Sequence, residues 1–502
     1  MSELKRSIAR GAAWNVLLKL LERSIGLVST LLLARLLVPA DFGLMAMATT
    51  VVAALELLGA YSFDMALVQN QKAGRSHYDT AWTLGVLIAL AKGILMVALA
   101  FPAAAFYDEP RLAWVMLALA VSTAYQGFEN IGIVAFQKEL RFDREFKLAL
   151  IRRLSGFAAT VVSAWLLQSY WALVIGISVT RFVSLWLTYR MHPYRPRWDL
   201  SRTGELFGYS KWLLMNNLLG FLNNRGIDLI IGRTHGPAAL GLYSVSNELA
   251  SLPTSELVYP IQRAVFPGYA RLAESGEELR TTFVQVIGVL AIVTVPAALF
   301  LGALAEPFVR AVLGSKWMDA VPLLQALAVF GALRAMDGPA SSIYLAVGKP
   351  RYMFNLQALQ LVVCFACLAW LLPAHGVIGA AWALIAGAAA SLAANYLLVL
   401  RVLSLEWRRL AEAVWRPVVS AVLVSGLLLW ILELVPPVSP ALQALTAAAL
   451  LVSLGTLGAL LYAAMILGAW VLQGRPAHGA EAMVLAVIRR SLPSRWRGDR
   501  AG

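Results

Sequence analysis

Ionisable and amide side chains recur at helical spacing inside an apolar segment near the N-terminus. Asn15, Lys19, Glu22 and Arg23 follow one another at steps of four, three and one residues, which keeps them on one face of a helix. A charge inside a bilayer costs about 2.5–3.5 kcal/mol on insertion scales, so it normally faces water or a partner. One net positive charge remains after Glu22 is paired. The stripe therefore favours an anionic solute, provided that these side chains face a cavity.

A second polar stripe lies in the apolar segment that begins near residue 208. Asn217, Asn224 and Asp228 share one face of the predicted helix, and Arg225 lies at its margin. The amides either stabilise helix packing, at about 0.6 kcal/mol for each hydrogen bond, or line a polar cavity. We favour the cavity, because an offset of 198 residues aligns Asn217 with Lys19.

Two further arginines, Arg181 and Arg334, also fall inside apolar segments and are candidates for binding an anion. The alternative for these cations is a structural ion pair. On that interpretation, Glu22 neutralises Arg23, Asp228 neutralises Arg225, and Asp337 neutralises Arg334.

Carboxylates in apolar segments could bind and release an ion. Glu56 and Glu248 rank first, since neither has a cation three or four residues away on its own helix. A carboxylate in a low dielectric can load and unload a proton, but it can equally be the fixed partner of an arginine. Coupling to protons, to sodium or to the membrane potential stays open.

The elements that must position these residues are membrane helices. Sixty per cent of the 502 residues are apolar and the mean hydropathy is +0.71, well above the values of soluble domains. The sequence predicts an all-α polytopic membrane protein with about fourteen spans. They are expected near 11–35, 42–63, 80–105, 112–136, 148–168, 170–190, 208–232, 239–260, 281–304, 321–346, 354–373, 377–399, 415–434 and 441–472.

The net charge of +14 is explained by membrane topology. Most Lys and Arg residues lie in alternate connections, counted from the N-terminus, which predicts that both termini are cytoplasmic. Basic loops on that side meet anionic lipid headgroups, so we expect no nucleic-acid partner.

A short sequence motif occurs twice and divides the chain into two related halves. Arg35, Pro39 and Gly43 recur 198 residues later as Arg233, Pro237 and Gly241, each time at a predicted corner between helices. The sequence thus predicts two six-helix lobes related by a pseudo-twofold along the membrane normal. The expected parts are lobes at 1–190 and 208–400, a cytoplasmic linker at 191–207, two extra helices within 401–472 and a basic cytoplasmic tail at 473–502. For Arg35 and Arg233 we favour capping of helix ends.

No catalytic, cofactor or metal site is expected. Cys364 and Cys367 lie inside an apolar span, where packing is the better interpretation than a redox or metal motif. The sequence also contains no recognisable nucleophile elbow and no Gly-rich phosphate loop.

Several motifs together resemble one family. The second corner reads Asp228-Leu-Ile-Ile-Gly232-Arg233 followed by Leu240-Gly241-Leu242-Tyr243, and the first reads Arg35-Leu-Leu-Val-Pro39-Ala-Asp-Phe42-Gly43. Further matches are Ala66-Leu-Val-Gln69 and Gln137-Lys-Glu-Leu-Arg141-Phe142. Their order and spacing resemble the polysaccharide-transporter family, the Wzx-like lipid-linked oligosaccharide flippases of the MATE/MOP superfamily.

The resemblance implies a V-shaped pair of lobes around a cavity lined largely by helices 1, 2, 7 and 8. It implies a bacterial inner-membrane protein that flips an undecaprenyl-diphosphate-linked oligosaccharide to the periplasmic leaflet by alternating access, for O-antigen, capsule or exopolysaccharide synthesis. Partners would be this substrate, membrane lipids, and the polymerase and export machinery of the pathway; we expect a monomer.

With such a substrate, each candidate residue has an expected role. The predicted diphosphate-binding residues are Lys19, Arg23, Arg225, Arg181 and Arg334, the predicted sugar-binding residues are Asn15, Asn217, Asn224 and Asp228, and the predicted ion-coupling residues are Glu56 and Glu248. The alternatives are a multidrug or cation exporter of the same superfamily and a membrane polysaccharide polymerase or ligase. The enzyme is disfavoured because its catalytic groups need a sizeable external loop, whereas the longest outward connection is about 305–320.

Overall fold

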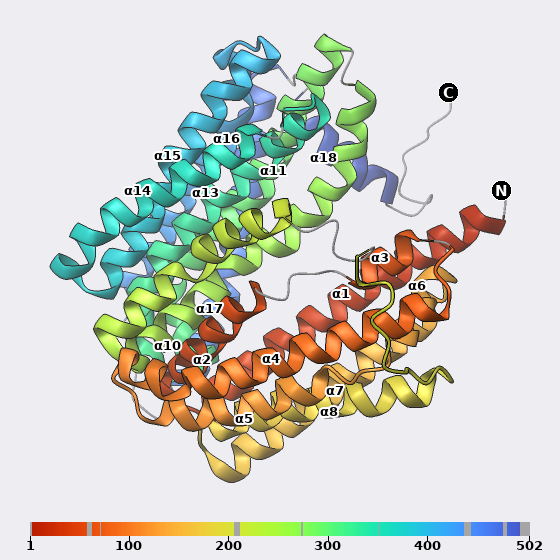
Figure 1. Cartoon of the computed structure of the whole chain (residues 1–502). Helices are drawn as coiled ribbons and strands as arrows, with labels where there is room; N and C mark the ends of the chain where they lie inside the picture. The colour runs from red at the N-terminus through yellow and green to blue at the C-terminus, as the bar shows by residue number, and fades with distance from the viewer. Residues whose placement is uncertain are drawn as a thin grey trace. The chain divides into compact units, whose positions relative to one another are not determined.

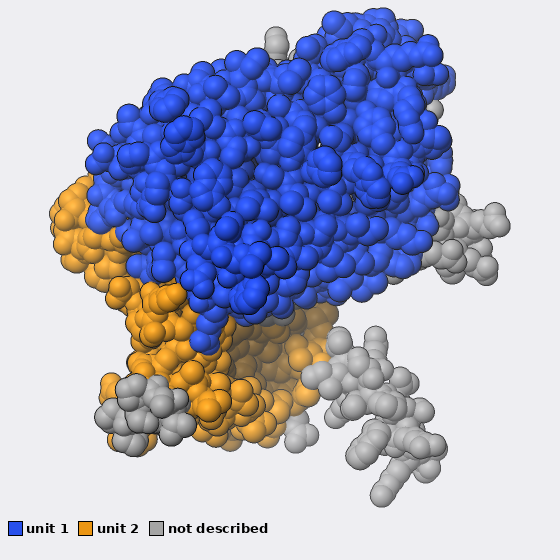
Figure 2. Space-filling view, turned by 90° about the horizontal axis from the view of Figure 1, so that it is seen from below, with its two compact units in different colours: residues 1–244 blue, residues 245–502 orange. Residues whose placement is uncertain are grey.

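The regular secondary structure in the described part of the chain is entirely helical (Figure 1). A computed structural model describes residues 3–57, 63–70, 72–204, 211–272, 275–349, 351–435, 443–474 and 479–491. The chain forms two compact units, unit 1 (Met1–Ser244) and unit 2 (Val245–Gly502), which Figure 2 distinguishes by colour. The all-α fold is thereby confirmed.

Unit 1 contains the helices of the first half of the chain and the start of α10. They are α1 (Glu3–Leu36), α2 (Pro39–Glu56), α3 (Phe63–Gln69), α4 (Arg75–Tyr107), α5 (Arg111–Gln126), η2 (Ile131–Ile133), α6 (Val134–Lys138), α7 (Phe142–Leu167) and α8 (Trp171–Met191). The long helices α1, α4, α5, α7 and α8 run side by side in Figure 1.

Unit 2 contains the rest of α10 and the later helices. Helix α10 (Lys211–Leu272) is interrupted at Gly236, whose φ of 77° is readily adopted only by glycine. The others are α11 (Gly276–Ala303), α12 (Ala305–Phe308), η3 (Val309–Leu313), η4 (Ser315–Ala320), α13 (Val321–Ala346), α14 (Arg351–His375), α15 (Val377–Leu403), α16 (Trp407–Glu433), α17 (Gln443–Leu472) and α18 (Ala480–Ser491).

Nine helical segments within the described residues are long and apolar enough to cross a membrane. They are α4, α7, α8, α11, the segment Ser315–Ala346, α14, α15, α16 and α17. The five other predicted spans coincide with α1, α2, α5 and the two parts of α10, which are not among the nine. The number fourteen therefore stays a prediction.

The predicted lobe boundaries also stay a prediction. The division into compact units falls inside α10, between Ser244 and Val245, and not in the predicted linker at 191–207. The tail contains α18, whereas residues 475–478 and 492–502 lie outside the described part of the chain.

Small residues set the close approach of α7 and α8. A Cβ atom on Gly156 would lie 1.9 Å from the Thr180 hydroxyl, and one on Gly176 would lie 1.7 Å from the Thr160 hydroxyl. Each threonine donates its hydroxyl hydrogen to the glycine carbonyl one turn earlier on its own helix. Glycine and threonine at this spacing let two membrane helices touch backbone to backbone.

The two repeated corners contact each other inside unit 1. A Cβ atom on Gly43 would lie 1.6 Å from the Pro237 carbonyl oxygen, and one on Gly241 would lie 1.8 Å from the Pro39 carbonyl oxygen. The contact is thus reciprocal, as expected for two copies of one motif. Only glycine fits at either position without a backbone shift.

Buried tyrosine and asparagine side chains join α13 to α15 in unit 2. The Tyr344 hydroxyl donates to Asn395 Oδ1 at 2.6 Å, and Asn395 Nδ2 donates to Asp337 Oδ1 at 2.6 Å. Asp337 is therefore held by an amide, whereas Arg334 is exposed one turn earlier and forms no ion pair with it. The structure does not show the pair that sequence spacing suggested for these two residues.

Both cysteines are thiols on α14. A Cβ atom on Gly387 of α15 would lie 2.9 Å from the Cys364 Cβ atom, so Cys364 packs at a tight helix crossing.

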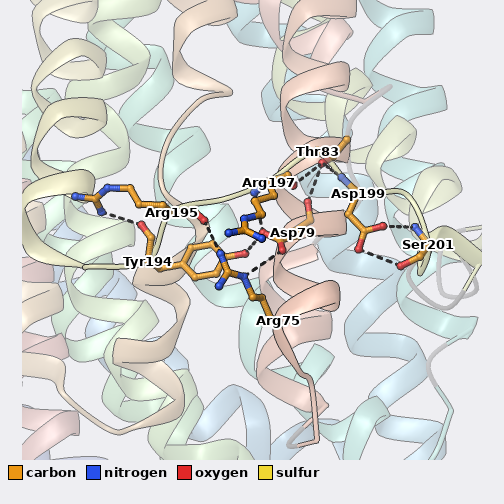
Figure 3. Close-up of polar contacts among 8 residues, drawn as sticks. All are labelled: Arg75, Asp79, Thr83, Tyr194, Arg195, Arg197, Asp199 and Ser201. Carbon is orange, nitrogen blue, oxygen red and sulfur yellow. Dashed lines mark hydrogen bonds and ion pairs between the residues drawn. The ribbon is translucent and has the colours of Figure 1, made fainter.

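The first part of the predicted linker is bound along the beginning of α4 (Figure 3). The carboxylate of Asp79, which is buried, accepts hydrogen bonds from the Tyr194 hydroxyl and from the Arg197 backbone N–H at 2.8 Å. Arg75 Nε lies 3.6 Å from the same carboxylate. Burial and the Asp79 hydrogen bond raise the pKa of Tyr194 above its ordinary value, so its hydroxyl stays a donor.

Further contacts extend this attachment along the linker. The Asp199 backbone N–H donates to the Thr83 hydroxyl at 3.0 Å, and Asn130 Nδ2 donates to the Tyr194 carbonyl at 2.7 Å. The Trp198 ring packs edge-on against Trp82, with ring centroids 5.1 Å apart. The linker up to Asp199 therefore belongs to the folded body of unit 1.

Candidate functional site

A cavity of about 450 Å³ lies among the helices of unit 1. Its walls come from α2, α3, α4, α5, η2 and α8, and its volume is in the range of small-ligand pockets. Its ionisable lining residues are Glu56, Asp64, Lys92, Glu129 and Arg181. The structure thus brings together two residues that the sequence singled out for different roles, Glu56 and Arg181.

Arg181 is held in the cavity wall by two hydroxyl groups of α5. Its Nη1 atom donates to Ser122 Oγ and to Thr123 Oγ1, both at 2.8 Å. Both hydroxyls donate in turn to the Leu119 carbonyl oxygen, so each can accept from the guanidinium. Arg181 has no ion-pair partner within 4 Å among the described residues. Its charge is positioned by neutral groups and stays available to the cavity.

Carboxylates surround this arginine at longer range. The Glu56 carboxylate interacts electrostatically with both Lys92 and Arg181, and Glu129 interacts with Arg181. With Asp64, three carboxylates face two cations across the lining. Fully ionised, the lining would carry one net negative charge. Such a wall suits uptake of a proton or a cation better than it suits a diphosphate.

Sequence reasoning missed Lys92 and Asp64 as members of this group. A signal was present for Lys92, since Gly85, Ala89, Lys92 and Met96 follow at steps of four, three and four and all line the cavity. Asp64 lies on the short helix α3, next to residues 58–62, which are outside the described chain.

The predicted anion-binding residues of helix 1 are exposed on α1. Lys19 and Arg23 each have an exposed side chain and interact with a neighbour. The side chain of Asn15 lies outside the described part of the structure. Neither Lys19 nor Arg23 lines the cavity of unit 1.

The predicted stripe on α10 contains an ion pair. Arg225 Nη1 lies 3.1 Å from Asp228 Oδ2, and the Asp228 side chain is 7% exposed against 40% for Arg225. Asp228 is therefore a fixed partner, as the structural alternative proposed, while part of the Arg225 side chain stays exposed.

The amides of the same stripe are partly used within their own helix. Asn224 Nδ2 donates to the Gly220 carbonyl at 2.8 Å, and Asn223 Nδ2 donates to the Leu219 carbonyl at 3.1 Å. Asn224 is exposed and Asn217 is half-buried. These local bonds leave the Asn224 amide oxygen as an acceptor for a hydroxyl-rich ligand.

Three residues do not line the cavity of unit 1. Arg334 on α13 and Glu248 on α10 are exposed and belong to unit 2. Arg233 is exposed near the break in α10, and its guanidinium lies over the Phe106 ring, 5.9 Å from the centroid. Such a cation–π contact supports a structural role for the corner arginine. The structure describes no group of three or more His, Cys, Asp or Glu residues placed to hold a metal ion, within the part of the chain it covers.

The sequence of the chain is similar to a protein family and to individual known proteins. The model of a family described as "Polysaccharide biosynthesis protein" matches residues 32–322. The chain is 25% identical over 71% of its length to the lipopolysaccharide biosynthesis protein WzxC of Escherichia coli, covering 73% of that protein. It is 23% identical over 70% of its length to the teichuronic acid biosynthesis protein TuaB of Bacillus subtilis, covering 74% of it.

Among solved structures, the lipid II flippase MurJ in an inward closed conformation has the same fold. The TM-score is 0.71 at 12% sequence identity, with 92% of this chain and 100% of that chain covered. An inward-facing multidrug resistance MATE transporter of the MOP superfamily matches with a TM-score of 0.56 at 14% identity, over 76% of this chain and 94% of that chain.

Proposed function

The chain belongs to the polysaccharide biosynthesis protein family, and we propose on that premise that it flips a lipid-linked oligosaccharide from the cytoplasmic to the periplasmic leaflet. The observation that carries the proposal is the family match over residues 32–322, combined with a polytopic helical fold shared with a lipid II flippase. The substrate would be an undecaprenyl-diphosphate-linked repeat for O-antigen, capsule or exopolysaccharide. The protein would work in a bacterial inner membrane with both termini cytoplasmic, because basic connections favour that side.

The proposed substrate site uses the exposed polar residues of α1 and α10. Lys19, Arg23 and the outward part of Arg225 supply positive potential for the diphosphate. Asn217 and Asn224 supply amide oxygens for sugar hydroxyls, and Asn15 stays a further candidate for the same role. Asp228 acts by holding Arg225 in place. Arg334 stays a further candidate for the diphosphate.

The cavity of unit 1 is the proposed coupling site. Glu56 accepts and releases an ion, and the positioned charge of Arg181 controls its affinity through their electrostatic interaction. Arg181 is accordingly assigned to coupling and no longer to diphosphate binding. Glu248 stays a second candidate for coupling in unit 2.

Deletion of the gene, followed by analysis of the lipid-linked oligosaccharide pool, tests the function. We expect finished precursor to accumulate facing the cytoplasm and to disappear when the gene is restored. Unpolymerised repeats facing the periplasm would instead indicate a polymerase of the same pathway, with which the protein is expected to cooperate.

A multidrug or cation exporter is the second candidate, because three carboxylates line the cavity of unit 1. On that alternative, deletion leaves the lipid-linked pool unchanged and raises sensitivity to cationic compounds. The same deletion strain therefore separates the two functions.

A further inference from the structure

A second cavity, of about 810 Å³, lies at one end of unit 2. It is located where α11 and α16 begin and α17 ends, beside the first residues of α18. The charged side chains of its lining are Glu277, Arg280, Arg409, Glu412 and Arg416. Its lining includes none of the residues proposed for transport.

An arginine in this lining is buried with unused hydrogen-bonding capacity. The side chains of Arg416 and Glu481 are 5% and 3% exposed, and Nε lies 3.1 Å from Oε1 in an ion pair that is not aligned as a hydrogen bond. Arg416 Nη1 and both Glu481 oxygens also lack a hydrogen-bond partner among the described residues. Buried charges normally have their hydrogen-bonding groups satisfied, so the Arg416–Glu481 pair beside the cavity has unused capacity for a further polar group.

Two other arginines are held in the wall by one carboxylate. Glu277 accepts from Arg409 Nη1 at 2.6 Å and from Arg280 Nη1 at 3.2 Å. Because both bonds converge on one carboxylate, Glu277 keeps the two guanidinium groups in position. The remaining wall carboxylate, Glu412, is exposed and forms no ion pair with another described residue. The lining thus offers both guanidinium groups and an unpaired carboxylate.

The charges of the wall indicate what kind of ligand the cavity can bind. With Glu481 included, the wall contains three arginines and three glutamates, so its net charge is zero. A ligand with a net negative charge is therefore not attracted by the wall as a whole. A ligand with a phosphate and an ammonium group fits both signs at once. The adjoining helix α16 also presents Trp407 and Trp415, 65% and 43% exposed, and tryptophan is enriched at membrane interfaces.

We propose that this cavity binds the zwitterionic headgroup of a membrane phospholipid of the phosphatidylethanolamine type. The phosphate accepts hydrogen bonds from Arg416 and Arg409, and the ammonium group donates to Glu412. The start of α18 borders the site, because Ala480 lines the cavity and a Cβ atom on Gly288 of α11 would lie 2.7 Å from Ala480 Cβ. The lipid would thereby join α11, α16 and α18.

Native mass spectrometry of the purified full chain tests the proposal after equilibration with phosphatidylethanolamine or phosphatidylglycerol at equal concentrations. We expect one phosphatidylethanolamine to be retained per chain and little phosphatidylglycerol. The variants Glu412→Gln and Arg409→Gln should each weaken retention about tenfold, the usual scale for a lost hydrogen bond to a charged group. The matched control is Glu433→Gln, an exposed carboxylate at the other end of α16.

Three results would overturn the assignment. They are equal retention of phosphatidylethanolamine by wild type and Glu412→Gln, equal or stronger retention of phosphatidylglycerol, and binding of soluble glycerophosphoethanolamine without any retained lipid. Arg416→Gln is omitted because it leaves Glu481 buried without its partner.

Discussion

At the scale of single residues, Arg181 and Arg225 are held in different ways. Arg225 is paired with Asp228 at 3.1 Å, whereas Arg181 is positioned by the hydroxyls of Ser122 and Thr123 and its charge is not neutralised by a contacting carboxylate. The electrostatic interaction between Arg181 and Glu56 therefore changes when Glu56 gains or loses an ion. Arg181 is therefore the most informative single position in the cavity.

Replacing Arg181 by Gln should lower transport at least about tenfold at normal protein levels, because three carboxylates would then face Lys92 alone. Precursor accumulation in a complemented deletion strain measures the effect. Arg190→Gln is the matched control, since Arg190 is exposed in the last turn of the same helix and its guanidinium lies over Trp186. Equal activity of both variants would contradict a role for Arg181 in coupling.

Sequence patterns indicated which charged residues lie in apolar segments, but not which of them lie close together in the folded protein. Arg181 and Glu56 lie 125 residues apart and share a cavity only because α2 and α8 both pack near α5. The direction in which a side chain points changes by about 100° for each residue of a helix, so small errors in placement reverse a cavity assignment.

At the scale of elements, the repeated corners are a structural contact. Sequence spacing placed Gly43 and Gly241 in equivalent positions, and the structure adds that each lies against the proline carbonyl of the other corner. Pairing between distant segments depends on packing of the whole helix bundle, which a local pattern does not specify. The repeat therefore predicted the equivalence but not the contact.

Gly43→Ala should disrupt this corner, because its Cβ atom would lie 1.6 Å from the Pro237 carbonyl oxygen and the backbone has to move. We expect a lower thermal unfolding temperature in detergent and reduced transport, by a destabilisation of about 1–3 kcal/mol. Gly468→Ala on α17 is the control, since a Cβ atom there meets nothing within 4 Å. If Gly43→Ala unfolded at the wild-type temperature, the corner contact would be unimportant.

At the scale of the whole molecule, composition and charge distribution were enough to predict a polytopic helical protein, and the resemblance of the corner motifs predicted the family. The division into compact units at Ser244 was not predictable, because a Gly-interrupted helix continues through it. The binding of the linker to α4 was not predictable from the sequence either, since Asp79 and Tyr194 are 115 residues apart.

Reconstitution is the most direct test of whether the protein flips a lipid-linked oligosaccharide. Purified protein is incorporated into liposomes that carry a labelled undecaprenyl-diphosphate-linked oligosaccharide, and glycan exposed on the outer leaflet is followed with an impermeant glycosidase. We predict that liposomes containing the protein expose the inner pool, that liposomes without it do not, and that the double variant Lys19→Gln/Arg23→Gln slows exposure. An inner pool that stays protected in liposomes with verified incorporation, under every ion gradient applied, would contradict it.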